Sequence, residues 1–230
     1  MALLVAIEGI DGSGKGTQAA RLQQSLNESG RPAALISFPR YDQTAFGRKI
    51  GDFLNGRFGR LDEVNPFLVS LLYAGDRFES KGVLHEAMQN HEVVIIDRYV
   101  PSNIAHQGAK LGGSERDEII DWIEQVEYGI YALPRPDLVV LLDLPATTAQ
   151  QLIARKSART YTDQAADLHE ADCAYLAGVR DLYCQLAARD AQWQKIDVES
   201  DGTLRPIDEI ATQLHELIAS RLAAGEQNPV

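Results

Sequence analysis

The sequence has little cysteine and no long apolar run, and both shortages narrow the class of protein. Two cysteines, Cys173 and Cys184, stand eleven positions apart in a stretch with helical periodicity. Eleven helical residues rise about 16 Å, which is too far for a disulfide, so we expect free thiols and a reducing, cytoplasmic location. No run of about 18 apolar residues occurs, and no basic segment precedes the first apolar run. We therefore expect neither a membrane span nor a targeting peptide.

Positive charge is also scarce. The 230 residues contain 22 Lys and Arg against 33 Asp and Glu, for a net charge of −11. This balance argues against a nucleic-acid partner. It leaves room for a small phosphorylated ligand, because such a ligand needs only a local group of cations. Sixteen of the cations are arginine, whose planar guanidinium suits paired hydrogen bonds to phosphate.

Short apolar runs alternate with longer segments of helical periodicity along the chain. The predicted strands are Leu3–Glu8, Ala33–Phe38, Val93–Asp97, Leu138–Asp143 and Trp193–Val198. The predicted helices are Gly16–Glu28, Ala45–Leu54, Pro66–Met88, Glu115–Tyr128, Thr147–Ala154, Leu168–Ala188 and Pro206–Ala223. Unbroken β-branched and leucine runs are typical of strands buried on both faces. The alternation predicts an α/β fold with a doubly wound, five-stranded parallel sheet and a ligand site at the carboxyl ends of its strands. We expect one domain over residues 1–224 and a flexible tail over 225–230.

The segment Gly9–Lys15 reads Gly-Ile-Asp-Gly-Ser-Gly-Lys and connects the first predicted strand to the first helix. Glycines at this corner let backbone N–H groups converge on an anion, and Lys15 adds a full positive charge. The alternative is a glycine-rich turn that only closes a strand–helix corner, but such a turn does not need Lys15. The predicted phosphate-binding residues are Gly9, Gly12, Ser13, Gly14, Lys15, Gly16 and Thr17.

The position after Lys15 departs from the usual motif. It holds Gly16 in place of the serine or threonine that meets Mg²⁺, and a hydroxyl follows only at Thr17. The run Gly14–Gln18 resembles the loop of adenylate kinases, which favours nucleoside monophosphate kinases over GTPase switches. The motif therefore does not identify the residue that binds Mg²⁺ directly.

Three polar clusters fall where the predicted sheet presents its carboxyl edge. They are Phe38-Pro39-Arg40-Tyr41, Asp97-Arg98-Tyr99 with the following Ser102–Gly108, and Tyr73–Arg77 on the long central helix. Taken singly, each has a structural explanation: a solvated loop arginine, a local ion pair or a core tyrosine. Together they predict three arginines, an aspartate and an aromatic ring around one mouth.

These motifs resemble those of thymidylate kinases. The likeness rests on Phe38-Pro39-Arg40, Asp97-Arg98-Tyr99, Asp11 within the glycine-rich loop, and Leu141–Pro145, and it extends from Met1 to about Leu186. It implies a P-loop NTPase-type sheet with a mobile lid near residues 154–167. It also implies a homodimer that phosphorylates dTMP to dTDP, with ATP as co-substrate and Mg²⁺ as cofactor.

The resemblance implies a role for each matching residue. Lys15 and the loop hold the ATP phosphates, Asp11 lies near the sugar hydroxyl and the metal, and Arg98 with Arg40 clamps the dTMP phosphate. Arg77 meets a thymine carbonyl, and Tyr73 stacks on the ring. The implied dTMP-binding residues are Asp11, Phe38, Arg40, Tyr73, Arg77, Arg98, Ser102, Asn103, His106 and Gln107. The implied metal-linked residues, partly through water, are Asp11, Asp97 and Glu170.

Two departures from the family pattern shape the expectations. The glycine-rich loop has no arginine of its own, so we expect Arg155 or Arg159 in the lid to act as a catalytic arginine, with a solvated basic turn as the alternative. His106 stands where relatives carry tyrosine or phenylalanine, which makes the choice of sugar less certain than the choice of base.

Two other functions stay open at this stage. One is a kinase for another nucleoside monophosphate, which Arg77 and Tyr73 disfavour. The other is a non-catalytic nucleotide-binding regulatory protein, which predicts a degraded acceptor site. The apolar run Phe67–Leu72 fits either the predicted dimer interface or burial within one subunit.

Overall fold

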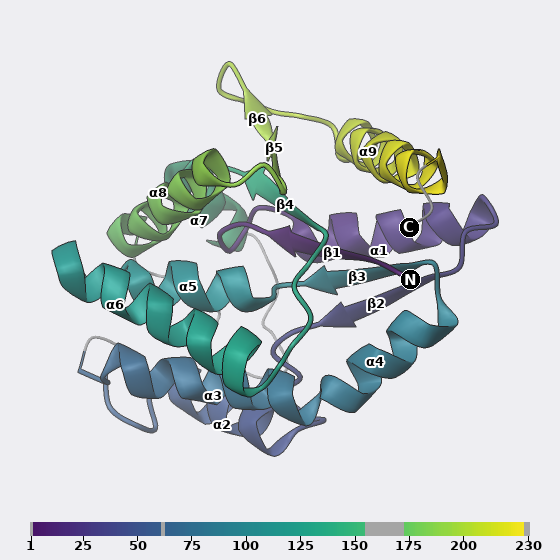
Figure 1. The fold of residues 1–230 in the computed structure, drawn as a ribbon. Helices are drawn as coiled ribbons and strands as arrows, with labels where there is room; N and C mark the ends of the chain where they lie inside the picture. The colour runs from purple at the N-terminus through teal and green to yellow at the C-terminus, as the bar shows by residue number, and fades with distance from the viewer. Residues whose placement is uncertain (1, 61–62, 155–172, 228–230) are drawn as a thin grey trace.

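The computed structural model describes residues 2–60, 63–154 and 173–227, the last four of these as backbone only. Its centre is a parallel sheet in the order β2-β3-β1-β4-β5 (Figure 1). The strands are β1 (Leu3–Glu8), β2 (Ala33–Ser37), β3 (Val93–Asp97), β4 (Leu138–Asp143) and β5 (Trp193–Asp197). The prediction of a doubly wound five-stranded parallel sheet is confirmed, with β2 and β5 each one residue shorter than expected.

The two faces of the sheet pack against different helices because alternate strand residues point in opposite directions. Val5 and Ile7 of β1 join the core with α1 (Lys15–Glu28), α7 (Ala146–Ala154), α8 (Cys173–Arg189) and α9 (Ile207–Gln227). Leu4 and Ala6 join the core with α4 (Lys81–Asn90), α5 (Val100–Gly108) and α6 (Gly113–Glu124). Both layers are visible in Figure 1, where α1 and α9 lie side by side.

A third apolar cluster joins α2 (Ala45–Leu54) to α3 (Pro66–Glu79). Its centre is Ile50, Phe53 and Val69, all with no exposed surface. Burying a side chain of this size stabilises the fold by about 1.5–3 kcal/mol. The α2–α3 pair is thereby fixed beside the carboxyl ends of β2 and β3, where the polar clusters of the sequence begin.

The prediction of a single helix over Pro66–Met88 is wrong, because the structure divides this segment into two helices at Ser80. The Ser80 hydroxyl donates to the Asp76 carbonyl oxygen at 2.8 Å and accepts from Arg40 Nη1 at 3.1 Å. A serine hydroxyl that competes for backbone carbonyl groups bends or ends a helix. The break lets α4 run along the sheet while α3 faces the site.

Two further segments differ from the prediction. Residues after the Asp97–Tyr99 cluster form α5, which begins beside Pro101 at a position where proline favours helix initiation. The helix expected over Glu115–Tyr128 instead comprises α6 and a π-helix, η1 (Gln125–Ile130). Periodicity cannot distinguish a π turn from an α turn over so few residues.

The chain after β5 forms a short hairpin, β6 (Glu199–Ser200) and β7 (Thr203–Leu204), before α9. Helix α9 continues to Gln227, past the Ala223 at which we expected it to end. Both cysteines are free thiols, as expected. None of the described helices combines the length and the apolar character that crossing a bilayer requires.

Candidate active site

The glycine-rich loop leaves β1 and enters α1 in a conformation that only glycine adopts readily. Gly9 has φ +144°, and a Cβ there would lie 2.6 Å from the carbonyl oxygen of Leu142. Gly14 caps α1 with φ +87° and provides no side-chain hydrogen bond. The first N–H groups of α1 are thus left without a side-chain cap, and the helix dipole adds partial positive charge there. This geometry suits an anion such as phosphate.

Lys15 lies at the start of α1 and is 6% exposed. Its Nζ donates to the carbonyl oxygen of Ile10 at 2.8 Å, within the same loop. Burial and then the positive charge of Arg98 lower the pKa of Lys15 to about 8. Burial and Arg98 thus disfavour the charged form of the Lys15 ammonium group, and a bound anion would favour it.

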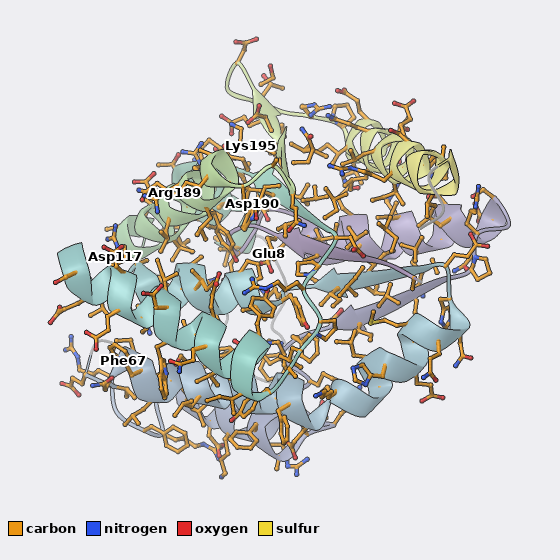
Figure 2. The ribbon with its side chains drawn as sticks, viewed as in Figure 1. Glu8, Phe67, Asp117, Arg189, Asp190 and Lys195 are labelled. Carbon is orange, nitrogen blue, oxygen red and sulfur yellow. The ribbon has the colours of Figure 1, made fainter. Side chains whose placement is uncertain are left out.

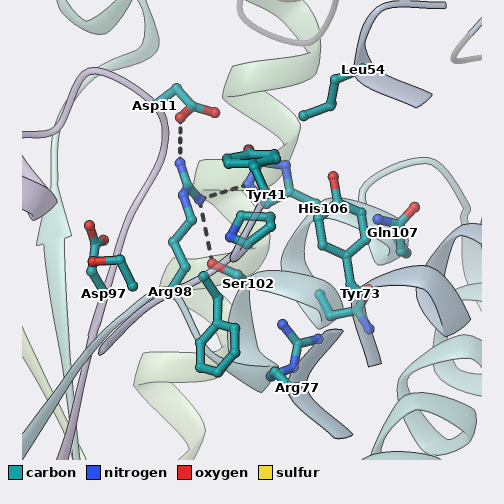
Figure 3. Close-up of a pocket in the computed structure, with 14 residues that line it drawn as sticks. Asp11, Tyr41, Leu54, Tyr73, Arg77, Asp97, Arg98, Ser102, His106 and Gln107 are labelled. Atoms are coloured by element: carbon teal, nitrogen blue, oxygen red, sulfur yellow. Dashed lines mark hydrogen bonds and ion pairs between the residues drawn. The ribbon is translucent and has the colours of Figure 1, made fainter. Parts of the chain in front are cut away.

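A pocket of about 340 Å³ opens beside the loop (Figure 3). Its walls come from the loop, the ends of β2 and β3, α2, α3 and α5. The lining residues are Asp11, Ser37, Phe38, Pro39, Tyr41, Leu54, Tyr73, Arg77, Asp97, Arg98, Ser102, Asn103, His106 and Gln107. Residues that the sequence placed in three separate clusters thus meet in one cavity.

Arg98 stands between the loop and the pocket. Its backbone has φ +66°, an unusual value for a residue with a side chain. Its guanidinium forms an ion pair with Asp11 and lies 3.4 Å from the Ser102 hydroxyl and 3.3 Å from His106 Nε2 (Figure 3). Such strain is characteristic of functional sites, where surrounding contacts hold the conformation in place.

The far wall of the pocket is built on a buried ion pair. Arg77 Nε and Nη2 donate to the carboxylate of Glu127 at 2.5 and 2.7 Å, and neither side chain is more than 2% exposed. Burial opposes the charge of Arg77, but the carboxylate of Glu127 outweighs it and raises the pKa of Arg77. Arg77 therefore faces the pocket as a permanent cation.

Among the implied dTMP-binding residues, Arg40 is the one that does not line the pocket. Its guanidinium is hydrogen bonded to Ser80 and Gln43, and its backbone N–H donates to Asp76 at 2.9 Å. The three-arginine mouth expected from the sequence is therefore two arginines, Arg77 and Arg98, in this structure. The role of Arg40 stays a prediction.

The sequence reasoning missed Glu8, the last residue of β1. Glu8 is completely buried, and its carboxylate accepts hydrogen bonds from Tyr99 N at 2.7 Å, Ser102 at 2.6 Å and Tyr183 at 2.9 Å. Figure 2 labels Glu8 in the interior, between the sheet and the helices. Burial raises its pKa, although these three donors oppose the rise. The sequence did contain one sign of Glu8, because it places an acidic residue at the end of an otherwise apolar strand. Glu127, Ser37 and Leu54 were also missed, whereas Tyr41 belongs to the Phe38–Tyr41 cluster that the sequence placed at the mouth, although no role was predicted for it.

The donor atoms near the loop fit a hard cation. Asp97 Oδ1 is buried and has no hydrogen-bond partner among the described residues. Asp97 Oδ2 faces Gly16, and a Cβ added to Gly16 would lie 3.2 Å from it. No group of three or more His, Cys, Asp and Glu side chains suited to a metal occurs in the described ranges. Magnesium needs only one or two carboxylates when phosphates and water complete its shell. Arg155, Arg159, Glu170 and most of the expected lid lie outside the described residues.

A glycine-rich loop between β1 and α1, with a two-arginine pocket at the carboxyl edge of a parallel sheet, defines a P-loop nucleoside monophosphate kinase. The family model for thymidylate kinase matches residues 7–203. The thymidylate kinase of Mycobacterium tuberculosis is 31% identical over 213 residues, covering 90% of this chain and 99% of that protein. The thymidylate kinase of Leifsonia xyli is 34% identical over 215 residues, covering 92% of each.

A solved structure of Candida albicans thymidylate kinase superposes with a TM-score of 0.73 at 26% identity, over 96% of this chain and 92% of that one. The chain belongs to the thymidylate kinase family. It is an ATP:dTMP phosphotransferase that produces dTDP.

Proposed function

We propose that the enzyme transfers the γ-phosphoryl group of ATP directly to the 5′-phosphate of dTMP, with dTMP in the 340 Å³ pocket and ATP on the glycine-rich loop. The ion pair between Asp11 of the loop and Arg98 of the pocket supports this assignment most strongly. This ion pair connects the proposed site for the ATP phosphates to the proposed site for the dTMP phosphate. Direct transfer requires the two sites to be adjacent.

The chemistry asks the protein mainly for position and charge. A phosphate oxygen of dTMP forms the new bond to the γ-phosphorus, and the bond from that phosphorus to the bridging oxygen of ATP breaks. Lys15 and the α1 N-terminus hold the donor phosphates, while Arg98 holds the acceptor phosphate. Asp97 and Asp11, with Glu170 as a further candidate, would hold Mg²⁺, which would supply positive charge against the donor phosphates. No side chain needs to act as nucleophile.

The base lies against the opposite end of the pocket in this proposal. Arg77 presents a donor to a thymine carbonyl, and Asn103 presents an amide to the neighbouring ring nitrogen. Tyr73 and Phe38 provide aromatic surface beside the ring, and both line the pocket. His106 lies toward the sugar with Gln107 next to it, and Ser102 orients Arg98.

Base recognition by Arg77 is tested with four deoxynucleoside monophosphates as acceptors. We expect dTMP to have the highest kcat/KM, and Arg77→Ala to reduce it by about 10- to 150-fold, since a hydrogen bond to a charged group contributes about 1.5–3 kcal/mol. The KM for ATP should stay within about twofold. A different preferred acceptor in the wild type contradicts dTMP as the substrate, whereas an unchanged dTMP constant in Arg77→Ala contradicts this pocket assignment.

The lowered pKa of Lys15 predicts a pH dependence of ATP binding. The phosphates of ATP favour the charged ammonium, so binding raises its pKa and takes up a proton wherever free Lys15 has lost one. ATP affinity should therefore be constant from pH 7 to 8 and fall as pH rises above about 8, by up to about tenfold per pH unit. Phosphate ends ionise near pH 6 and do not contribute in this window.

Isothermal titration calorimetry over pH 7–9.5 measures this fall. Lys110 also has a pKa lowered to about 8 by burial, so Lys110→Met is the matched control and should keep the slope. Lys15→Met should bind ATP weakly and without the slope. A slope that disappears in Lys110→Met and persists in Lys15→Met contradicts the assignment.

The proposal extends to a homodimer in the cytoplasm. Leu68 of α3 is 64% accessible, Phe46 of α2 is 38% accessible, and Phe58, which follows α2, is 46% accessible. Large apolar side chains on neighbouring helices favour association through this face. The two free thiols fit a reducing compartment.

A further inference from the structure

Glu127 lies in an unusual turn of helix, next to residues that line the substrate pocket. It belongs to the π-helix η1, where Tyr131 N donates to Val126 O at 2.8 Å across five residues. Leu133 N then donates to the carbonyl oxygen of Glu127 at 2.9 Å. Glu127 itself has no exposed surface. Single π turns often occur at functional sites because they redirect one side chain.

The carboxylate of Glu127 holds two of the side chains that line the pocket. Oε2 accepts from Arg77 Nε at 2.5 Å, and Oε1 accepts from Arg77 Nη2 at 2.7 Å and from Asn103 Nδ2 at 2.9 Å. Glu127 does not line the pocket itself. It acts on the pocket only through these neighbours.

The amide of Asn103 has one permitted orientation in this arrangement. Its Nδ2 also donates to the carbonyl oxygen of Ser70 at 3.0 Å. Both partners of Nδ2 are pure acceptors, because an ionised carboxylate and a backbone carbonyl have no proton to donate. A rotation that exchanged the amide nitrogen and oxygen would set Oδ1 against two oxygens. The amide nitrogen therefore faces away from the pocket.

The remaining polar atoms form a fixed pattern. Asn103 Oδ1 is buried and has no hydrogen-bond partner among the described residues. Nη1 of Arg77 is likewise without a hydrogen bond in the described part of the chain. A buried polar atom without a partner costs free energy, so Asn103 Oδ1 indicates a ligand group that completes it, and Arg77 Nη1 is available as a donor to the same ligand. The pocket offers one donor, from Arg77, and one acceptor, from Asn103.

This pattern distinguishes the two common pyrimidines. Thymine presents the O4 acceptor next to the N3–H donor, whereas cytosine presents the N4–H₂ donor next to the N3 acceptor. A donor from Arg77 and an acceptor from Asn103 match thymine, and against cytosine both contacts are reversed. Whatever fixes the direction of these two side chains also fixes the choice of base.

We propose that Glu127 is a positioning residue that sets base specificity, by forcing the donor edge of Arg77 and the acceptor oxygen of Asn103 toward the ligand. The inference rests on the proposed binding of the base between Arg77 and Asn103. It goes beyond that assignment, because it places the origin of thymine selection in a side chain that does not contact the ligand. Glutamine at position 127 can donate as well as accept, so it removes the restriction on Asn103 and weakens the hold on Arg77.

The test compares Glu127→Gln and Glu127→Asp with the wild type, using dTMP and dCMP as acceptors at saturating ATP. In Glu127→Gln, we expect the kcat/KM for dTMP to fall at least about tenfold, mainly through KM, and the dTMP-to-dCMP preference to fall at least about fivefold. Glu127→Asp retains a pure acceptor, so it should lose dTMP affinity and keep most of the preference. If Glu127 had only a structural role, the dTMP-to-dCMP preference would not differ between these two variants.

Two control variants separate the proposal from general damage. Glu124→Gln makes the same change three residues earlier, at a 44% exposed glutamate that forms an ion pair with Arg135, and should match the wild type. Asp143→Asn weakens the ion pairs of a different buried carboxylate with the partly exposed Arg180 and Lys195, and it reports the stability lost without an effect on base choice. Thermal unfolding of every variant identifies those that fold.

Two results would overturn the inference. One is an unchanged base preference in a folded Glu127→Gln protein. The other is a loss of the dTMP-to-dCMP preference of about fivefold or more in Glu127→Asp, a result that can be read even if the glutamine variant does not fold. Arg77→Ala, measured in parallel, keeps the two proposals apart. If it leaves dTMP binding intact, the base assignment fails; if it weakens dTMP binding while Glu127→Gln does not, only the role of Glu127 fails.

Discussion

Replacing Lys15 with alanine is expected to abolish most phosphoryl transfer while the protein stays folded. Loss of a preorganised positive group at a site of developing negative charge costs about 10²–10³ in kcat. The cost to folding should be small, since burial already disfavours the charged ammonium, as its pKa of about 8 indicates. Steady-state kinetics at pH 7.5, together with thermal unfolding, measures both effects.

Lys49→Ala is the matched control for this variant. Lys49 is 60% exposed and pairs with Asp52 on the surface, so its loss should leave kcat unchanged. A folded Lys15→Ala enzyme with near-normal kcat would contradict the assignment of the donor phosphates to the glycine-rich loop.

Arg98→Ala should have an effect of similar size, divided between dTMP binding and catalysis. The substitution removes the proposed clamp on the acceptor phosphate and takes from Asp11 its ion-pair partner. We expect kcat/KM for dTMP to fall by at least about 10²-fold, because truncating one member of a buried charge pair costs several kcal/mol. ATP affinity should change less, since Lys15 and the α1 N-terminus remain.

Arg98→Lys and Arg31→Ala refine this test. Lysine keeps the charge but not the planar fork that reaches Asp11, Ser102 and His106 together, so it should restore little activity. Arg31 forms a surface ion pair with Glu92, and its loss should be neutral. Full rescue by lysine would show that charge alone matters at this position.

The parts of the fold predicted from sequence are those with a local cause. The apolar runs at 93–97 and 138–143 became β3 and β4 with their predicted bounds. The glycine-rich loop was found because its glycines and lysine lie within seven residues. In each case neighbouring residues carry the whole signal.

The parts that were missed depend on distant residues. Glu127 meets Arg77 across 50 positions, and Tyr183 meets Glu8 across 175. Each is an ordinary charged or aromatic residue in a helical pattern, and only the tertiary structure reveals its partner. The sequence indicated that Arg77 contributes to a site, but it contained no sign of which residue fixes its direction.

The division of the Pro66–Met88 helix has the same origin. Helical periodicity continues through Ser80, and the bond that helps to end α3 comes from Arg40 in another segment. Local propensity is a weak prior that such contacts override.

The pairing of β1 with β3 sets the position of Arg98 relative to the glycine-rich loop. Ile7 lies opposite Asp97, and Arg98 N donates to the carbonyl oxygen of Ile7 at 3.2 Å, two residues before the glycine-rich loop begins. In the proposed arrangement, the register of this strand pair sets the spacing between the donor and acceptor sites, and a one-residue slip would change that spacing by about 3.3 Å. The proposed base-selecting residues lie elsewhere, on α3, α5 and η1. Acceptor preference can therefore change through helix residues while the distance over which the phosphoryl group travels stays constant.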